Sequence, residues 1–400
     1  MATRVDVLAY LIAALLAAVL VMMLTPAVRR LVIRFGLLDR PADRKVHTSA
    51  IPQLGGIAIY VSFVVAASLG VLVLGARDLI PGLGALLAAG LIVVGLGIYD
   101  DLMTASARVK LPVQIIAALL IVGFGFRIHS ITNPVGGVIR LTWISVPVSV
   151  VWLVAFMNAL NLVDGLDGLA AGLAAIAAAT LFVGGLMFGN QFSSVLMAAL
   201  FGVCVAFLYF NFHPASIFMG DTGSLFLGLV FGTVGLAEGG KSVALIVLLV
   251  PLTALGVPLI DTVMAVCRRT ARRRYIFAGD KEHIHHRLLG LGFSHRQVVL
   301  ILYGLAALLG MVALALATAN RAIILFFSAT AAGFAGWGAV RLRIIGPERR
   351  NRISSQAGSP GESGSEQVST LPGNSSRSPM DGVLARGDRH PGRGELRGDD

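Results

Sequence analysis

The stretch NALNLVDGLDGLAAG (residues 158–172) lies between two apolar segments, near 143–160 and 168–188, each close to the length of a membrane span. A spanning helix needs roughly 20 mostly apolar residues. The connection itself carries amides and carboxylates, which are costly in hydrocarbon. This order of segments therefore predicts a membrane protein with polar groups gathered at one membrane face.

Four more polar, charge-bearing stretches interrupt the otherwise apolar chain. A membrane protein that gathers such stretches on one face is expected to build one polar site there. In chain order they are DRPADRKVHTSAIPQLGG (39–56), GIYDDLMTASARVK (97–110), NFHPASIFMGDTGSLFLG (211–228) and DKEHIHHRLLGLGFSHR (280–296).

The composition supports a membrane protein and argues against a nucleic-acid-binding one. The 400 residues are 56% hydrophobic and 13% charged, whereas soluble domains carry about 25% charged residues. The net charge of +11 comes from basic residues that cluster in loops beside apolar segments. Membrane orientation and contact with anionic membrane lipid explain such clusters, and no nucleic acid is expected as a partner.

Apolar segments of spanning length predict the fold class, which is all-α: a polytopic membrane helical bundle of about eleven transmembrane helices. The segments are 6–25, 54–75, 82–99, 111–127, 143–160, 168–188, 193–210, 222–237, 242–266, 298–318 and 322–340.

Lysine and arginine are unevenly distributed among the connections and so predict the orientation. They are abundant after the first segment, before 298–318 and after the last segment. Because cytoplasmic loops carry the excess of Lys and Arg, the N-terminus is predicted outside and the C-terminus inside. All five polar stretches then lie on the cytoplasmic face of a multi-pass protein of the cell (plasma) membrane.

The C-terminal segment differs in composition from the rest of the chain. Residues 346–400 are rich in Gly, Ser, Pro and Arg and carry few large apolar side chains. Such a segment cannot bury enough surface to offset its ordering entropy. We predict a membrane-embedded domain over 1–345 and a disordered cytoplasmic tail over 346–400.

Asp100 and Asp101 are adjacent acids at the end of an apolar segment. Such a pair suits a general base or a cation site, although a solvated helix end is the alternative. Lys110 follows at the mouth of the next segment, where it can meet a phosphate or simply snorkel to the membrane surface.

Asn158, Asn161, Asp164 and Asp167 recur every three residues. At that spacing neighbouring members share a helical face, and their oxygens are hard ligands that suit Mg²⁺. A polar helix terminus with capping residues is the alternative.

The sequence GDTGS (220–224) places an acid between glycines before an apolar run. Asp221 can N-cap a helix that begins near Thr222, and it can also bind a metal ion. No Gly-Lys-Ser/Thr follows, so a Walker A nucleotide site is unsupported.

The last polar stretch, 280–296, contains a histidine-rich loop. Three histidines can bind zinc, but no Cys or HExxH pattern accompanies them, so hydrogen bonding to a sugar or a phosphate fits better. An arginine in the same loop can donate two parallel hydrogen bonds to a phosphate. These residues are His283, His285, His286 and Arg287.

Taken in order, the five stretches resemble motifs of the polyprenyl-phosphate N-acetylhexosamine-1-phosphate transferase family over about residues 30–300. The resemblance implies a UDP-N-acetylhexosamine donor, a polyprenyl phosphate acceptor (undecaprenyl or decaprenyl), release of UMP, and a Mg²⁺ cofactor that Mn²⁺ can replace. The HIHHRL loop resembles that of the N-acetylglucosamine branch.

The resemblance also implies roles for individual residues. It makes Asn161 and Asp221 metal ligands, Asp100 and Asp101 the acidic pair at the acceptor, and Lys45 and Lys110 phosphate-proximal lysines. Asp164 and Asp167 would lie near the uridine and diphosphate. The remaining substrate-binding candidates are His47, Asn158, His283, His285, His286 and Arg287.

Two other functions remain open at this stage. One is the sibling phospho-muramoyl-pentapeptide transferase reaction. The other is secondary transport, which is disfavoured because the acids cluster at span ends and no repeat is visible, whereas transporter sites typically lie near mid-bilayer between repeats. The sequence does not distinguish a monomer from a homodimer.

Overall fold

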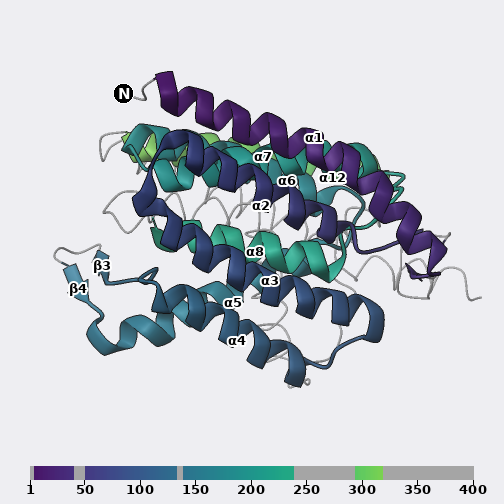
Figure 1. Cartoon of the computed structure of the whole chain (residues 1–400), viewed down its shortest axis with the longest axis horizontal. Coiled ribbons are helices and arrows are strands. Elements are labelled where there is room, and N and C mark those ends of the chain that lie inside the picture. Colours follow the sequence, from purple (N-terminus) through teal and green to yellow (C-terminus); the bar gives the residue numbers. More distant parts are fainter. Residues whose placement is uncertain (1–3, 40–49, 133–137, 238–292, 319–400) are drawn as a thin grey trace, which may run out of the picture. The chain divides into compact units, whose positions relative to one another are not determined.

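The computed structural model describes residues 4–39, 50–132, 138–237 and 293–318, all within one compact unit, Met1–Ala332. These residues are mainly helical (Figure 1). The helices are α1 (Arg4–Arg34), α2 (Gly55–Leu74), α3 (Ile80–Met103), α4 (Ala107–Gly123), α5 (Ser145–Val163), α6 (Leu169–Phe188), α7 (Gln191–Asn211), α8 (Gly220–Ala237) and α12 (His295–Thr318).

Within the described ranges, 8 helices are long and apolar enough to cross a membrane. The expectation of a polytopic helical membrane protein is confirmed at this level. The short α4, of 17 residues, overlaps the predicted span 111–127 but begins at Ala107 and ends at Gly123. The predicted spans 242–266 and 322–340 and the predicted tail lie outside the described residues, so the total of eleven spans stays a prediction.

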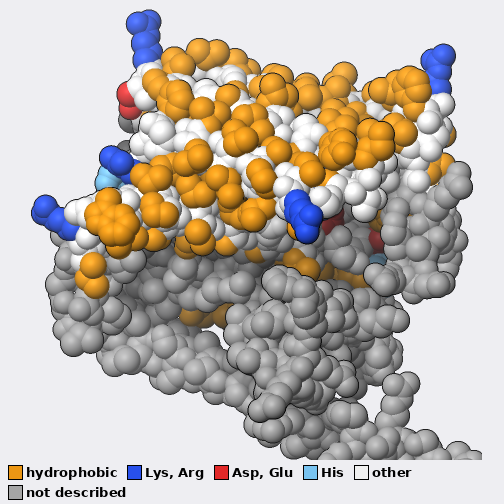
Figure 2. All heavy atoms as spheres, turned by 90° about the horizontal axis from the view of Figure 1, so that it is seen from below, with side chains coloured by type: hydrophobic (Ala, Val, Ile, Leu, Met, Phe, Trp, Pro, Cys, Tyr) orange, Lys and Arg blue, Asp and Glu red, His pale blue; other side chains and the backbone are white. Residues whose placement is uncertain are grey.

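Hydrophobic side chains cover much of the described part of the face seen in Figure 2, and few charged side chains lie among them. Exposed apolar residues occur on α3, α4 and α5, including Leu91, Leu119 and Val151. A surface of this kind suits contact with lipid.

Helix α1 is longer than the predicted span 6–25. It continues through Pro26 to Arg34, so arginines that we expected in a loop lie on its last turns. Arg29 Nε donates to Ser216 O at 3.0 Å and thereby ties α1 to the segment before α8. The hydropathy pattern detects only the apolar part of a helix, and arginine is a good helix former beyond it.

Two short antiparallel strand pairs accompany the helices and were not predicted. Strand β1 (Leu38–Asp39) pairs with β2 (Ile51–Pro52), and β3 (Ser130–Thr132) pairs with β4 (Val138–Arg140). Runs of two or three residues are too short to give a period-2 pattern in the sequence.

Helix α8 is the central helix of the region that carries the polar groups. It packs against α2, α3 and α5 (Figure 1), and every residue from Thr222 to Val234 is buried. A helix that is apolar on all sides is expected in such an interior position. The aromatic rings of Tyr60 and Phe63 on α2 meet Phe226 edge-on and fill this interface.

Glycines bring the backbones of α2 and α3 onto the first turn of α8. A Cβ atom built at Gly56 would lie 2.2 Å from Gly223 N, and one built at Gly97 would lie 2.3 Å from Thr222 Cα. Small residues allow this close approach in membrane helix pairs. The polar start of α8 is therefore held against the two neighbouring helices with no room for a side chain between them.

The helix ends that carry the polar stretches meet at one end of the bundle. Lys110 at the start of α4 reaches both Asp100 at the end of α3 and Asp221 at the start of α8. Asn161 near the end of α5 also contacts α8, through Ser224. The described parts of the polar stretches thus converge, as expected for spans that alternate in direction.

Candidate active site

Asp100, Lys110 and Asp221 form what we call the acid–lysine cluster. The Lys110 ammonium lies between the two carboxylates, 2.8 Å from Asp221 Oδ2 and in direct contact with Asp100 Oδ2. The second oxygen of Asp100 accepts from Ala105 N at 2.6 Å. The side chains of Lys110 and Asp221 are about one quarter exposed, 26% and 25% respectively, so the cluster is accessible to a ligand.

Asp101 points to different partners from its neighbour Asp100. Its carboxylate accepts hydrogen bonds from Asp221 N at 2.8 Å, Thr222 N at 3.2 Å and Thr222 Oγ1 at 2.7 Å. These donors belong to the first turn of α8, whose N–H groups have no partner within the helix. An acid on α3 therefore caps α8.

This arrangement corrects the expectation that Asp221 caps a helix beginning near Thr222. Helix α8 begins at Gly220, and Asp221 lies within its first turn. Gly220 adopts φ +69°, and a Cβ atom built there would lie 2.3 Å from Asp101 Oδ2. The absence of a side chain at this position makes room for a capping carboxylate from the neighbouring helix.

Asn161 and Ser224 extend the acid–lysine cluster toward α5. Asn161 Nδ2 donates to Ser224 Oγ at 3.1 Å, and Ser224 Oγ donates to Gly220 O at 3.1 Å. Because the Asn161 amide donates through its nitrogen, its carbonyl oxygen remains the group suited to a cation.

Asn158 faces a different neighbour. Its Nδ2 donates to Oε1 of the buried Gln114 on α4 at 2.8 Å, and Gln114 Nε2 returns a bond of 3.4 Å to Asn158 Oδ1. These bonds join α4 to α5. The structure gives Asn158 an interhelical contact and does not link it by a described hydrogen bond to the acid–lysine cluster.

The expectation that Asn158, Asn161, Asp164 and Asp167 share one helical face is wrong for the two acids. Helix α5 ends at Val163, so both acids lie in the connection to α6. Gly168 in that connection adopts φ +78°, a left-handed conformation that glycine favours and that breaks the helical path.

Asp164 lies among other carboxylates at the end of α5. Burial raises its pKa well above the ordinary value, and the charge of nearby carboxylates, above all Asp221, acts in the same direction. Asp221 of the acid–lysine cluster is therefore close enough for its charge to act on Asp164.

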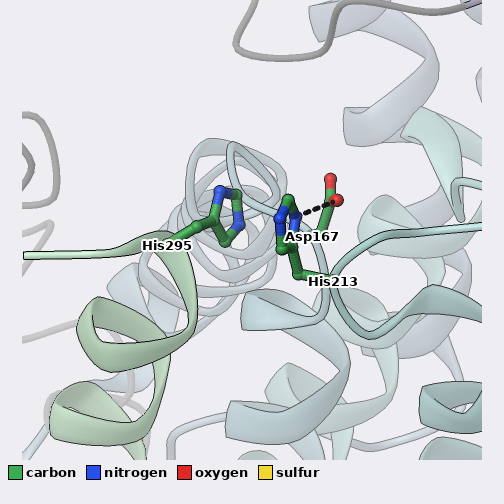
Figure 3. Close-up of side chains that lie close together, drawn as sticks. All are labelled: Asp167, His213 and His295. Atoms are coloured by element: carbon green, nitrogen blue, oxygen red, sulfur yellow. Dashed lines mark hydrogen bonds and ion pairs between the residues drawn. The ribbon is translucent and has the colours of Figure 1, made fainter.

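Asp167, His213 and His295 form a second group, which we call the histidine stack (Figure 3). His213 Nδ1 donates to Asp167 Oδ2 at 2.8 Å, and Ala215 N donates to the same oxygen at 3.1 Å. The two imidazole rings stack with centroids 4.3 Å apart and planes 13° apart. The three residues come from the α5–α6 connection, the segment after α7 and the start of α12.

By residue type the histidine stack could hold a metal ion, since one ligand atom from each residue lies within 4.8 Å of the others. An imidazole binds a metal ion through a nitrogen lone pair, which lies in the ring plane. Two stacked, nearly parallel rings cannot both direct such a lone pair at one ion. As the residues lie, they position one another instead of converging on a metal.

Further hydrogen bonds fix the connection that carries Asp164 and Asp167. Gly168 N donates to Asn211 Oδ1 at 3.1 Å, and the Tyr303 hydroxyl donates to Gly168 O. Asn211 Nδ2 in turn donates to Ile217 O at 3.0 Å. Helices α7 and α12 thus hold the loop between α5 and α6 in place.

Several residues near the site were not singled out from the sequence. Gln114 gives no sequence signal, because a single amide in an apolar helix is common. His213 and His295 lie within two of the polar stretches, so a search for every histidine in those stretches would have found them. The predicted residues Lys45, His47, His283, His285, His286 and Arg287 lie outside the described residues.

The acid–lysine cluster and Asn161 fit a hard divalent cation better than the histidine stack does. They offer two carboxylates and an amide oxygen, which are the donors that Mg²⁺ prefers. The Lys110 ammonium already lies between the carboxylates, which shows that positive charge is favoured at this place.

Comparison with known proteins gives consistent relatives. The model of glycosyl transferase family 4 matches residues 83–238. A Bacillus subtilis protein named "Probable undecaprenyl-phosphate N-acetylglucosaminyl 1-phosphate transferase" is 40% identical over 307 residues, which cover 76% of this chain and 84% of that protein.

Two further relatives are similar over most of the chain. The decaprenyl-phosphate N-acetylglucosaminephosphotransferase of Mycobacterium tuberculosis is 36% identical, with 72% of this chain and 78% of the relative covered. The phospho-N-acetylmuramoyl-pentapeptide-transferase of Thermosynechococcus vestitus is 33% identical, with 76% and 83% covered. The family predicted from the motifs is confirmed, and the chain belongs to glycosyl transferase family 4.

Proposed function

We propose that this protein transfers N-acetylglucosamine 1-phosphate from UDP-GlcNAc to polyprenyl phosphate. A phosphate oxygen of the acceptor attacks the β-phosphorus of the donor, the bond between that phosphorus and the bridging oxygen breaks, and UMP leaves with that oxygen. The product is a polyprenyl diphosphate that carries the sugar. The bridging of two carboxylates by Lys110 is the observation that carries this proposal.

Phosphoryl transfer depends on charge neutralisation and positioning. In this proposal Asp221 and Asn161 would hold Mg²⁺, which would supply positive charge that offsets the charge of the donor diphosphate. Lys110 donates to a phosphate oxygen of a substrate. Its present contacts with two carboxylates show that its ammonium reaches the space between α3 and α8.

Asp100 is the acid proposed to act on the acceptor. Its side chain is 9% exposed and its Oδ2 contacts the more exposed Lys110 ammonium, so an incoming phosphate meets the ammonium first and the carboxylate next to it. Asp100 accepts the proton of a monoprotonated acceptor phosphate, and Lys110 orients the phosphate oxygens. General-base assistance of this kind contributes roughly 10²- to 10⁴-fold.

Asp164 and Asp167 are proposed to face the nucleotide part of the donor. The support is that their loop is fixed by Asn211 and Tyr303 and lies close enough to Asp221 for that charge to act on it. The HIHHRL loop is proposed to recognise the sugar by hydrogen bonding. The proposed location of the site is the cytoplasmic face, which the distribution of arginine and lysine supports.

A second candidate keeps the chemistry and changes the donor. The Thermosynechococcus relative, named for the muramoyl-pentapeptide reaction, is 33% identical to this chain, so that donor needs a direct test. The names of the bacillary and mycobacterial relatives, at 40% and 36% identity, favour N-acetylglucosamine.

The test uses purified full-length protein, radiolabelled UDP-GlcNAc, Mg²⁺ and either undecaprenyl or decaprenyl phosphate, followed by lipid extraction. We expect labelled lipid and an equal amount of UMP. Turnover only with the muramoyl-pentapeptide donor would show that the protein catalyses the phospho-muramoyl-pentapeptide transferase reaction instead. Uptake of a solute by proteoliposomes without any lipid product would favour transport.

A further inference from the structure

We infer that Asp101, the second acid of the adjacent pair, is a positioning residue that fixes the start of α8 and thereby Asp221, and that it does not itself act on the acceptor. The inference rests on the proposed function, because it divides the roles of two acids within the same site.

The directions of the hydrogen bonds carry the inference. Both carboxylate oxygens of Asp101 are used: Oδ1 accepts from Asp221 N, and Oδ2 accepts from Thr222 N and Thr222 Oγ1. A carboxylate has about four acceptor positions, and three of those of Asp101 accept hydrogen bonds from α8. A residue that takes a proton from the acceptor needs a free position that faces the acceptor.

The cap meets a need of α8 that, among the described hydrogen bonds, no side chain of α8 itself meets. The first N–H groups of a helix lack intrahelical partners, and they are expensive to leave unpaired in an apolar environment. A negatively charged cap also interacts favourably with the positive end of the helix dipole. Asp101 provides both effects from α3.

The packing around the cap leaves little freedom. A side chain at Gly220 would collide with the Asp101 carboxylate, and a Cβ atom at Gly97, one turn earlier on α3, would collide with Thr222. Gln53 Nε2 donates to the backbone oxygen of Asp101 at 3.2 Å and fixes the same turn of α3 from the segment before α2.

The consequence reaches the groups proposed to hold the metal ion. Asp101 bonds the backbone N–H of Asp221, whose carboxylate meets Lys110. One turn further along α8, Ser224 accepts from Asn161. Fixing the first turn of α8 therefore sets the separation between Asp221 and Asn161 without any contact between Asp101 and the substrate.

The experiment compares Asp101→Asn with Asp100→Asn in the purified full-length protein. Asparagine is about as good a helix cap as aspartate. Its oxygen can accept from Asp221 N and its amide can donate to Thr222 Oγ1, so the variant loses the acceptor of Thr222 N and keeps the other two contacts. We expect Asp101→Asn to keep kcat within about 10-fold of wild type, whereas Asp100→Asn loses roughly 10²-fold or more.

A second pair of variants tests the link to the metal site. Thr222→Val removes one donor to Asp101, and Thr222→Ser keeps it. Binding of Mn²⁺ in the presence of UDP, measured by electron paramagnetic resonance, gives a readout that is independent of turnover. We expect Thr222→Val to weaken Mn²⁺ binding and to raise the Mg²⁺ concentration for half-maximal activity, while Thr222→Ser matches wild type.

The outcomes separate this inference from the proposed function. A wild-type protein that makes no lipid product would contradict the proposed function itself. An active wild type whose Asp101→Asn variant loses as much kcat as Asp100→Asn, with unchanged Mn²⁺ binding, would overturn the positioning role. Asp101→Ala risks failing to fold, so Asp101→Asn and Thr222→Val carry the test.

Discussion

The acid–lysine cluster and the histidine stack lie at the same end of the bundle and contain similar chemical groups, yet they are built for different tasks. In the acid–lysine cluster a long side chain holds its ammonium between two carboxylates from different helices. In the histidine stack two rings lie face to face and one carboxylate oxygen takes two hydrogen bonds.

The difference shows that residue type alone does not identify a metal site. Asp167, His213 and His295 satisfy a distance criterion for three ligands, but the stacked ring planes prevent their lone pairs from converging. Asp221, Asp100 and Asn161 look less like a transition-metal site, and their hard oxygens suit Mg²⁺. The predictions below test this division, from the largest expected effect to the smallest.

The largest loss is expected from Asp221→Ala. Without this carboxylate the proposed Mg²⁺ site loses its central ligand, and turnover should fall on the order of 10³-fold or more. The measurement is kcat across a series of Mg²⁺ concentrations.

The matched control for Asp221→Ala is Asp78→Asn, because Asp78 is an exposed acid in the short helix before α3. It should behave as wild type. Near-normal turnover of Asp221→Ala at low Mg²⁺ would show that Asp221 is not a ligand of the metal ion.

Lys110→Gln should be the next most damaging change. It removes the positive charge between Asp100 and Asp221, so the carboxylates repel one another and a substrate phosphate loses a donor. We expect kcat/KM to fall roughly 10²-fold, and Lys110→Arg to recover part of the loss. Arg108→Gln is the control, because Arg108 is an exposed cation two residues before Lys110 on the same helix. Equal effects at the two positions would indicate a general charge effect.

Gly97→Ala should reduce stability more than it alters chemistry. The added Cβ would meet the Thr222 backbone at 2.3 Å, and such overpacking costs about 1–3 kcal/mol in the free energy of unfolding. Thermal unfolding in detergent measures the effect. Gly95→Ala on the same helix is the control, because a Cβ there has no neighbour within 4 Å. Equal melting temperatures would contradict the close contact of α3 with α8.

The smallest effect is expected in the histidine stack. His213→Phe keeps an aromatic ring against His295 and removes the donor to Asp167. We expect the KM for the UDP-sugar to rise by about 10-fold or less, in line with one lost hydrogen bond, while kcat changes little. A zinc-selective chelator should leave the wild type active. Loss of activity with that chelator would contradict the positioning role of the stack.

Much of the architecture could be predicted because hydropathy reports directly on membrane spans. Eight described helices coincide with predicted apolar segments and have the length and composition of membrane spans. The alternating direction of such spans then implied that the ends of α3 and α5 would meet the start of α8. The C-terminal end of α1 was predicted too early. Pro26 and the arginines after it continue the helix to Arg34, but they lie beyond the apolar pattern from which the span was predicted.

The finer geometry of the site could not be predicted, because it depends on contacts between distant parts of the chain. Asp100 and Asp101 are adjacent in sequence, and only the position of α8 shows that one meets Lys110 and the other a helix terminus. The regular spacing of Asp164 and Asp167 suggested a helix, but α5 ends at Val163, before both acids. The pairing of His213 with His295 joins the segment after α7 to the start of α12, which are far apart in the sequence.

The most direct test of the central claim is Mn²⁺ binding to the purified protein with UDP present, measured by electron paramagnetic resonance for wild type, Asp221→Ala and His213→Phe. We expect Asp221→Ala to lose the bound Mn²⁺ signal and His213→Phe to keep it. Loss of the signal in His213→Phe, together with its retention in Asp221→Ala, would place the ion at the histidine stack and contradict the account.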